Sequence, residues 1–228
     1  MNVQLALDTS TDIASLALVK DGLVLAEMTW RTNRNHTIQL MPSLEQLFKL
    51  TGSNSQSLTG IIVGLGPGSF NGLRVGVSAA KGLAFSLDIP IVGINSLEVT
   101  AYQYAVTGLP VCPIINAGRS EVATAIYQTV AGKWQQIAPD QIITLDLLCA
   151  RITQETIFCG EFVPQITAQL RAQLRDKAVI SSSLTDLRRG AFLAELGLRR
   201  LNAGDRDNVS TLQPVYLRRP PITQAKKL

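Results

Sequence analysis

The first thirty residues carry a hydrophobic pattern that predicts three β-strands. The segment VQLALDTSTDIASLALVKDGLVLAEMTW gives strands at Val3–Asp8, Ala14–Lys20 and Leu23–Trp30. Asp21 and Gly22, between the last two strands, form a strong hairpin signal. We therefore expect the chain to open with three strands, the last two joined by a tight turn.

Helical periodicity follows in the segment NHTIQLMPSLEQLFKLTG. Apolar residues recur at helical spacing from Ile38 to Phe48, Pro42 falls early enough to be tolerated, and Gly52 ends the pattern. This segment is predicted to be an amphipathic helix. The rest of the first half is predicted to contain a strand at Gly60–Gly64, a helix at Asn71–Leu87, a strand at Ile89–Asn95 and a helix around Ser96–Val106.

The pattern partly begins again after Gly108. The second half is predicted to contain strands in VCPIINAG, EVATAIYQTV, near Trp134, at Thr156–Cys159 and at Ala178–Ile180, and helices in TLDLLCARI, in PQITAQLRAQL and over residues 185–202. Two α/β lobes, residues 1–107 and 108–228, account for this order better than one continuous sheet. The closing segment LQPVYLRRPPITQAKKL is rich in proline and basic, and is expected to be extended.

Composition excludes several classes of protein. The 228 residues are 46% hydrophobic and 5% aromatic, which suits a packed core and not a surface that stacks bases. The formal charge of +4 is matched by four basic residues of the tail, so autonomous nucleic-acid binding is not expected. Those residues are Arg218, Arg219, Lys226 and Lys227.

Cysteine usage and hydropathy indicate a cytoplasmic protein without a membrane partner. Cys112, Cys149 and Cys159 lie in apolar surroundings without C-x-x-C spacing, so they are expected to be reduced core residues. Asp8 and Asp12 interrupt the first apolar segment, and no apolar run approaches the length of a membrane span.

The segment GLGPGSFNGLRVG, residues 64–76, raises the question of a phosphate-binding loop. Glycines at the junction of a strand and a helix are suited to holding anions. A P-loop, however, needs G-x-x-x-x-G-K-[ST], and no Lys-Ser or Lys-Thr pair follows at that distance. The motif alone therefore does not establish nucleotide binding.

Small residues form a stripe along the helix that follows this segment. Gly72, Gly76, Ala80 and Ala84 recur every four residues, although each interior glycine costs about 1 kcal/mol of helix propensity. Close contact with another backbone offsets such a cost, and the protein's own sheet is favoured over a partner helix. The other flank is left available to a partner and contains Arg74, Ser78, Lys81 and Phe85.

Two polar positions have competing interpretations. Asp8 ends a strand and enters a polar turn, where its carboxylate either holds a hydrated Mg²⁺ beneath phosphates or organises the turn through local hydrogen bonds. His36 is the only histidine, so every His-His metal site is excluded. Because no nucleophile pattern lies nearby, we expect the segment Asn35–Thr37 to cap a helix or to face a partner.

Several segments together resemble the TsaD/Kae-type family of the actin-like ATPase fold. They are LALDTSTDIASLAL, NHTIQLMPSLEQL, GLGPGSFNGLRVGVSAAKGLA, IPIVGINSLE and PVYLR, in family order over nearly the whole chain, with Asn71 where the family's GSFTG has threonine. The resemblance implies a two-lobed actin-like (ASKHA, RNase H-like) α/β fold, each lobe a mixed sheet with flanking helices. It also implies the non-catalytic branch, because Ser96 and Thr100 stand where TsaD has its metal-binding H-x-x-x-H, and hydroxyls are poor ligands for a transition metal.

The resemblance further implies partners. A subunit of this branch binds the catalytic paralogue TsaD and, with the small ATPase TsaE, supports threonylcarbamoyl transfer to the adenosine beside the anticodon of ANN-decoding tRNAs. We expect a homodimer in isolation, contact with tRNA only through the complex, and no catalytic residue, metal ligand or cofactor. The expected interface, on the two helices of the first lobe, comprises His36, Leu40, Leu44, Leu47, Arg74, Ser78, Lys81 and Phe85.

Nucleotide binding is expected to be damaged. The chain has no Gly-Gly pair for an adenosine loop, and Asn116 in INAGRSEV stands where an acidic residue is common. Weak residual binding is assigned to Asp8, Thr9, Ser10 and Asn116. The alternatives are a small phosphotransferase that uses Asp8 and the glycine segment, and a glycoprotease-type metallopeptidase, which the single histidine disfavours.

Overall fold

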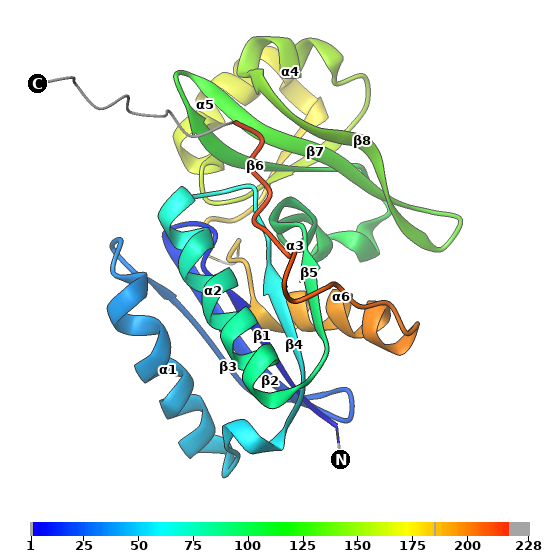
Figure 1. The fold of residues 1–228 in the computed structure, drawn as a ribbon. Coiled ribbons are helices and arrows are strands. Elements are labelled where there is room, and N and C mark those ends of the chain that lie inside the picture. Colours follow the sequence, from blue (N-terminus) through cyan, green and yellow to red (C-terminus); the bar gives the residue numbers. More distant parts are fainter. Residues whose placement is uncertain (1, 185, 219–228) are drawn as a thin grey trace, which may run out of the picture.

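Two five-stranded sheets of the same topology form the framework of the computed structural model, which describes residues 2–184 and 186–218 (Figure 1). The strand orders are β3-β2-β1-β4-β5 and β8-β7-β6-β9-β10. In each sheet the first three strands form an antiparallel meander and two parallel strands are added beside the first. The repeated pattern expected after residue 108 is therefore present as a repeated topology.

The strands agree closely with the sequence pattern. The turn of the first hairpin has positive φ at both Asp21 and Gly22, as a two-residue hairpin turn of this kind requires. The strands are β1 (Val3–Asp8), β2 (Ile13–Lys20), β3 (Leu23–Arg31), β4 (Leu58–Gly64), β5 (Ile91–Ile94), β6 (Val111–Gly118), β7 (Glu121–Val130), β8 (Lys133–Thr144), β9 (Thr156–Cys159) and β10 (Ala178–Ile180).

The helices also lie where they are expected, and two of them are shorter than predicted. The helix predicted over Ser96–Val106 ends at Tyr102 and is followed by a separate 3-10 turn, and the last helix begins at Gly190 instead of residue 185. The helices are α1 (His36–Thr51), α2 (Phe70–Leu87), α3 (Ser96–Tyr102), α4 (Leu145–Arg151), α5 (Val163–Leu174) and α6 (Gly190–Asn202).

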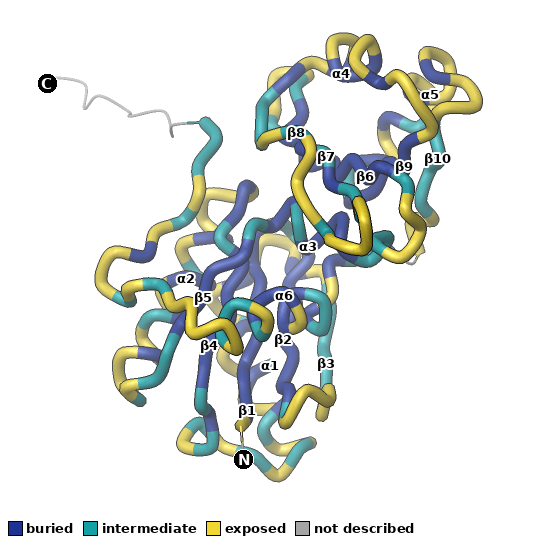
Figure 2. The backbone as a smooth tube through the Cα atoms, turned by 90° about the vertical axis from the view of Figure 1, so that its right-hand side faces the viewer, coloured by how far each residue is buried: buried dark blue, intermediate teal, exposed yellow. Residues whose placement is uncertain are grey.

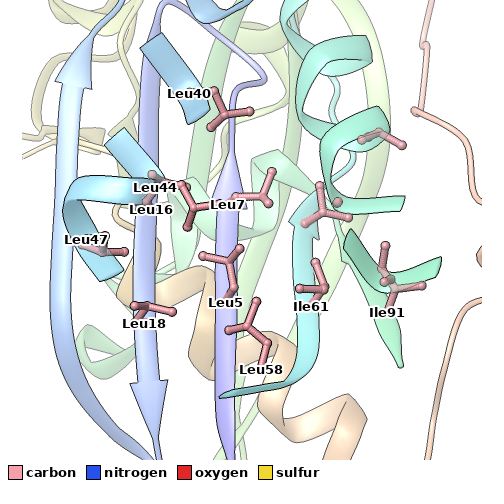
Figure 3. Packing of buried hydrophobic residues seen from close by; sticks show 14 of the residues in the cluster. Leu5, Leu7, Leu16, Leu18, Leu40, Leu44, Leu47, Leu58, Ile61 and Ile91 are labelled. Carbon is pink, nitrogen blue, oxygen red and sulfur yellow. The ribbon is translucent and has the colours of Figure 1, made fainter. Parts of the chain in front are cut away.

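Helices α1 and α2 cover one face of the first sheet. Leucines of α1 point toward leucines of β1 and β2 in Figure 3, and these side chains are buried together. Strands β1, β2 and β4 are buried along nearly their whole length (Figure 2), as expected for central strands covered on both faces. The leucines of this layer are Leu5, Leu7, Leu16, Leu18, Leu40, Leu44 and Leu47.

Helix α6 covers the opposite face of the first sheet, although it lies near the end of the chain. Gly197 packs directly on Ile62 of β4, and Gly190 on the backbone of β2, so these glycines bring the helix close to the sheet. The stretch 108–228 thus supplies a helix to the first sheet. Helix α3 lies between the lobes and contributes to the core of each.

The second sheet packs α4 and α5 on its outer face. After α6 the described residues 203–218 run back along the first lobe without a helix or strand. The backbone N–H of Asp207 donates to Ile91 in β5, that of Val215 donates to Leu65, and Arg218 bonds Ala117 and Glu121 in the second lobe. We call residues 205–218 the strap, because they cross both lobes. Of the closing segment 212–228 that is expected to be extended, residues 219–228 lie outside the described residues.

No helix among the described residues is long and apolar enough to cross a membrane.

Candidate functional site

The glycine stripe of α2 packs on the turn between β1 and β2. The Oγ1 of Thr9 donates a hydrogen bond to the carbonyl oxygen of Gly72 at 2.7 Å. A Cβ atom at Gly72 would overlap the backbone oxygen of Thr9, and one at Gly76 would overlap its hydroxyl. Ala80 and Ala84 continue the buried stripe. The expectation that the stripe faces the protein's own sheet is therefore confirmed.

The loop before α2 closes on the same turn. A Cβ atom at Gly64 would overlap the carboxylate of Asp8, and one at Gly68 would overlap the backbone oxygen of Ser10. The N–H of Ser69 donates to that same oxygen at 2.6 Å. The glycines at the start of the motif thus make room for the turn formed by Asp8, Thr9 and Ser10, which are all buried.

Asp8 is fully buried and is paired inside the protein. One carboxylate oxygen accepts the backbone N–H of Ser10 at 2.7 Å, and the other accepts Nε of Arg188 at 2.8 Å. A buried carboxylate needs such partners, because its desolvation would otherwise cost several kcal/mol. Asp8 therefore organises its turn through the N–H of Ser10, and its other carboxylate oxygen is paired with the guanidinium of Arg188.

Arg188 carries the network across the cleft between the lobes. Its side chain is buried, and its terminal nitrogens donate to Glu161 at 3.2 Å, to Thr11 at 2.8 Å and to the carbonyl oxygen of Ile13 at 3.2 Å. Thr11 also donates to Glu161 at 2.5 Å. The two carboxylates keep this guanidinium charged and raise its pKa against the opposing effect of burial, which is the largest single influence.

A cleft of about 380 Å³ opens above this network, between the two lobes. It is lined by Asp12, Arg31 and Gln165 besides Arg188 and Glu161. The exposed Asn116 also lines it, but its amide oxygen accepts the N–H of Gly118 and so shapes the β6–β7 turn.

Of the four residues assigned to residual nucleotide binding, only Asn116 is exposed. Asp8, Thr9 and Ser10 are buried, and glycines of the loop before α2 and of α2 pack against them.

His36 lines a neighbouring hollow and is largely buried. It is the first residue of α1 and is buried beside Gly72, with Nε2 3.3 Å from the hydroxyl of Thr32. Burial lowers its pKa, although the nearby Thr11 backbone and Asp12 oppose the shift. Asn35 makes no side-chain cap. The Asn35 side chain therefore does not cap α1, and His36 is largely buried.

The hydroxyls of Ser96 and Thr100 make local hydrogen bonds. Ser96 Oγ accepts the N–H of Gly66 at 3.0 Å, and Thr100 donates to the carbonyl oxygen of Ser96 at 2.8 Å. Within residues 2–184 and 186–218, no group of three or more His, Cys, Asp or Glu side chains is arranged to hold a metal ion.

The two first-lobe helices place the expected interface residues in different environments. Leu40, Leu44 and Leu47 are buried in the core, so they support α1 and do not reach its outer surface. The large apolar side chains that α1 exposes are Ile38, at 71%, Met41, at 52%, and Leu50, at 69%. The spacing from Ile38 to Phe48 thus identified the helix but not its inward face.

On α2, Arg74, Ser78 and Phe85 are exposed as expected, and Phe85 is 76% exposed. Arg74 lies over the ring of Phe70, 5.1 Å from its centre. Lys81 has another role, because its Nζ donates to the carbonyl oxygens of Ser210 and Leu212 in the strap, at 3.1 and 2.9 Å.

Arg188 and Glu161 are the site residues that sequence reasoning missed. Arg188 is one of a pair of arginines before α6, and Glu161 follows a short strand, so neither stands in a recognisable motif. Their relation to Asp8 spans most of the chain, and no local spacing signals it.

The comparisons with known proteins cover nearly the whole chain. The family model described as "TsaD: tRNA N6-adenosine threonylcarbamoyltransferase" matches residues 24–219. The tRNA threonylcarbamoyladenosine biosynthesis protein TsaB of Bacillus subtilis (strain 168) is 33% identical to the chain over 94% of the chain and 93% of that protein. The protein of the same name from Escherichia coli (strain K12) is 28% identical over 94% of each.

Among solved structures, YeaZ from Pseudomonas aeruginosa superimposes with a TM-score of 0.80 at 25% identity and covers 95% of this chain and 100% of that one. The expected two-lobed actin-like fold is confirmed by this match and by the two mixed sheets.

Proposed function

This chain belongs to the TsaD family, in its TsaB (YeaZ) branch, and on that premise we propose that it is a non-catalytic subunit that binds TsaD and supports threonylcarbamoyl transfer to tRNA. The observation that carries the proposal is that Asp8 is fully buried and already paired inside the protein. Its carboxylate is paired with Arg188 behind a glycine-lined wall, which leaves no open cation site there for phosphoryl chemistry. The relatives' names place them in threonylcarbamoyladenosine biosynthesis.

The finer parts of the proposal follow the resemblance. TsaE assists the pair, the target is the adenosine beside the anticodon of ANN-decoding tRNAs, and tRNA is reached only through the complex. In isolation the chain forms a homodimer through the surface that TsaD otherwise covers. An exposed apolar surface tends to find a self-complementary copy when its proper partner is absent.

The proposed contact surface is the outer face of α1 and α2. It comprises Ile38 and Met41 on α1 and Ser78 and Phe85 on α2, and we call it the helix surface. These side chains are exposed above a rigid layer, since the leucines beneath α1 and the glycine stripe beneath α2 fix both helices on the sheet. Exposed apolar groups on rigid elements are typical anchors of a protein interface.

The test replaces Phe85 or Met41 by glutamate and measures co-purification with TsaD. Either charge would be buried without a partner in the complex, so association is expected to fall by at least about tenfold, or about 1.4 kcal/mol. Val106→Glu is the matched control, because Val106 is 95% exposed on the turn after α3, away from the helix surface. Lys81 is a poor probe, since changing it also releases the strap.

Two outcomes would count against the proposal. If folded Phe85→Glu and Met41→Glu variants bind TsaD like the parent protein, the helix surface is not the interface. If the isolated chain transfers threonylcarbamoyl to tRNA, or turns over Mg·ATP without TsaD, the non-catalytic assignment fails. Activity only in the mixture of the two proteins is the expected result.

A further inference from the structure

Arg188 is held by groups from both lobes at once. Asp8 and Thr11 belong to the β1–β2 end of the first lobe, and Glu161 follows β9 in the second. The side chain of Arg188 is 2% exposed and that of Asp8 is fully buried. This ion pair lies in the interior of the cleft, where screening by water and salt is weak.

The chemistry of the contacts is that of a cation site. Two carboxylates, a hydroxyl and a backbone carbonyl oxygen surround one positive charge, and these are the hard oxygen groups that Mg²⁺ or Mn²⁺ would take as ligands. The actin-like ATPase fold implies a metal-bound nucleotide in this cleft. The residues present do not fit that group, because the guanidinium already neutralises Asp8 and fills the space beside it.

We infer that Arg188 is an internal cation that takes the place of a divalent metal ion at Asp8, excludes metal-bound phosphates from the cleft and ties the two lobes together without a nucleotide. A planar guanidinium suits this position, because its donors can engage several oxygens in fixed directions. This inference is independent of the partner assignment, since it concerns the cleft and not the helix surface.

One consequence can be measured directly. Replacing Arg188 by alanine removes the positive charge and leaves Asp8 and Glu161 facing the vacated space with the hydroxyl of Thr11. Two carboxylates in a partly buried site repel one another, and a divalent cation would relieve that repulsion. The Arg188→Ala variant is therefore expected to acquire a cation site that the parent protein lacks.

The experiment measures Mn²⁺ binding by calorimetry and the melting temperature with and without Mn²⁺. We expect no binding by the parent protein, and binding with a raised melting temperature in Arg188→Ala. Arg189→Ala is the matched control, because it removes the same charge at the neighbouring position. The side chain of Arg189 is half-exposed and pairs with Glu27. Adding Asp8→Asn to Arg188→Ala is expected to abolish the new Mn²⁺ binding.

Three results would overturn the inference: Mn²⁺ binding by the parent protein that Asp8→Asn removes, a folded Arg188→Ala variant that binds no Mn²⁺, or equal binding by Arg189→Ala. If Arg188→Ala does not fold in metal-free buffer, refolding is repeated with Mn²⁺. Rescue that is lost in the double variant supports the inference, and failure of Mn²⁺ to rescue it contradicts the inference.

Discussion

The hydroxyl of Thr9 donates its hydrogen bond to the carbonyl oxygen of Gly72, and so the first β-turn is fixed to the first turn of α2. The two residues are in van der Waals contact because Gly72 has no side chain. What resembles a phosphate-binding loop is therefore in contact with the protein's own backbone. The glycines serve a close approach between a helix and a turn.

This contact predicts opposite effects for two glycine-to-alanine changes in the same helix. Gly72→Ala would place a methyl group on the backbone oxygen of Thr9, and such overpacking costs about 1–3 kcal/mol. Gly82→Ala meets nothing within contact distance, and is expected to stabilise the protein by up to about 1 kcal/mol through helix propensity. Urea unfolding of both variants measures the difference. A Gly72→Ala protein as stable as Gly82→Ala would contradict the packing described above.

The buried His36 predicts a pH dependence of stability. Desolvation lowers its pKa in the folded state below the ordinary value of 6.5, so the neutral ring is favoured by folding. Its contribution is fully present above about pH 6.5 and is lost as the pH falls through the lower folded pKa. Because it is the only histidine, its ring protons give a single NMR titration, which is expected to have a midpoint below 6.5.

His36→Gln provides the control for that titration. The free energy of unfolding of this variant, subtracted from that of the parent protein, isolates the histidine from the carboxyl groups that titrate at lower pH. The difference is expected to shrink as the pH falls below 6.5. A midpoint above 6.5 would mean that the Thr11 backbone, Asp12 and Asp8 together outweigh burial.

Lys81 is predicted to hold the strap onto α2. In Lys81→Met the carbonyl oxygens of Ser210 and Leu212 lose a charged donor. A hydrogen bond that involves a charged group contributes about 1.5–3 kcal/mol to stability. Hydrogen exchange in residues 208–213 is expected to accelerate while α1 and α2 keep their protection. Arg74→Met is the control on the same helix, since Arg74 lies over Phe70. Unchanged exchange in Lys81→Met would show that Leu212, buried in the core, is sufficient to hold the strap.

The three cysteines are predicted to resist thiol reagents in the native protein. Burial raises the pKa of Cys112 to about 12 and that of Cys159 well above its usual range, and it also raises the pKa of Cys149. Because the thiolate is the reactive form, labelling at mildly alkaline pH is expected to be slow and to reach all three residues only in denaturant. Rapid labelling of one native cysteine would reveal local opening around it.

Local patterns predicted most of the elements but not the inward face of α1. Alternation and turn residues are properties of neighbouring positions, so β1 to β3 and their hairpin could be predicted almost to the residue. On α1, one apolar row runs through Leu40, Leu44 and Leu47 and another through Ile38 and Met41. Both rows obey helical spacing, and only packing on the sheet decides between them.

The sequence by itself determined the two-lobed fold, the stripe along α2 and the absence of any two-histidine metal site, because each follows from local spacing or from a residue count. Only the tertiary structure decided what Asp8 does. Its partner Arg188 lies 180 positions away, in the segment that leads α6 back onto the first sheet. An ion pair between such distant residues exists only once both lobes and α6 are in place, so no pattern of neighbouring residues encodes it.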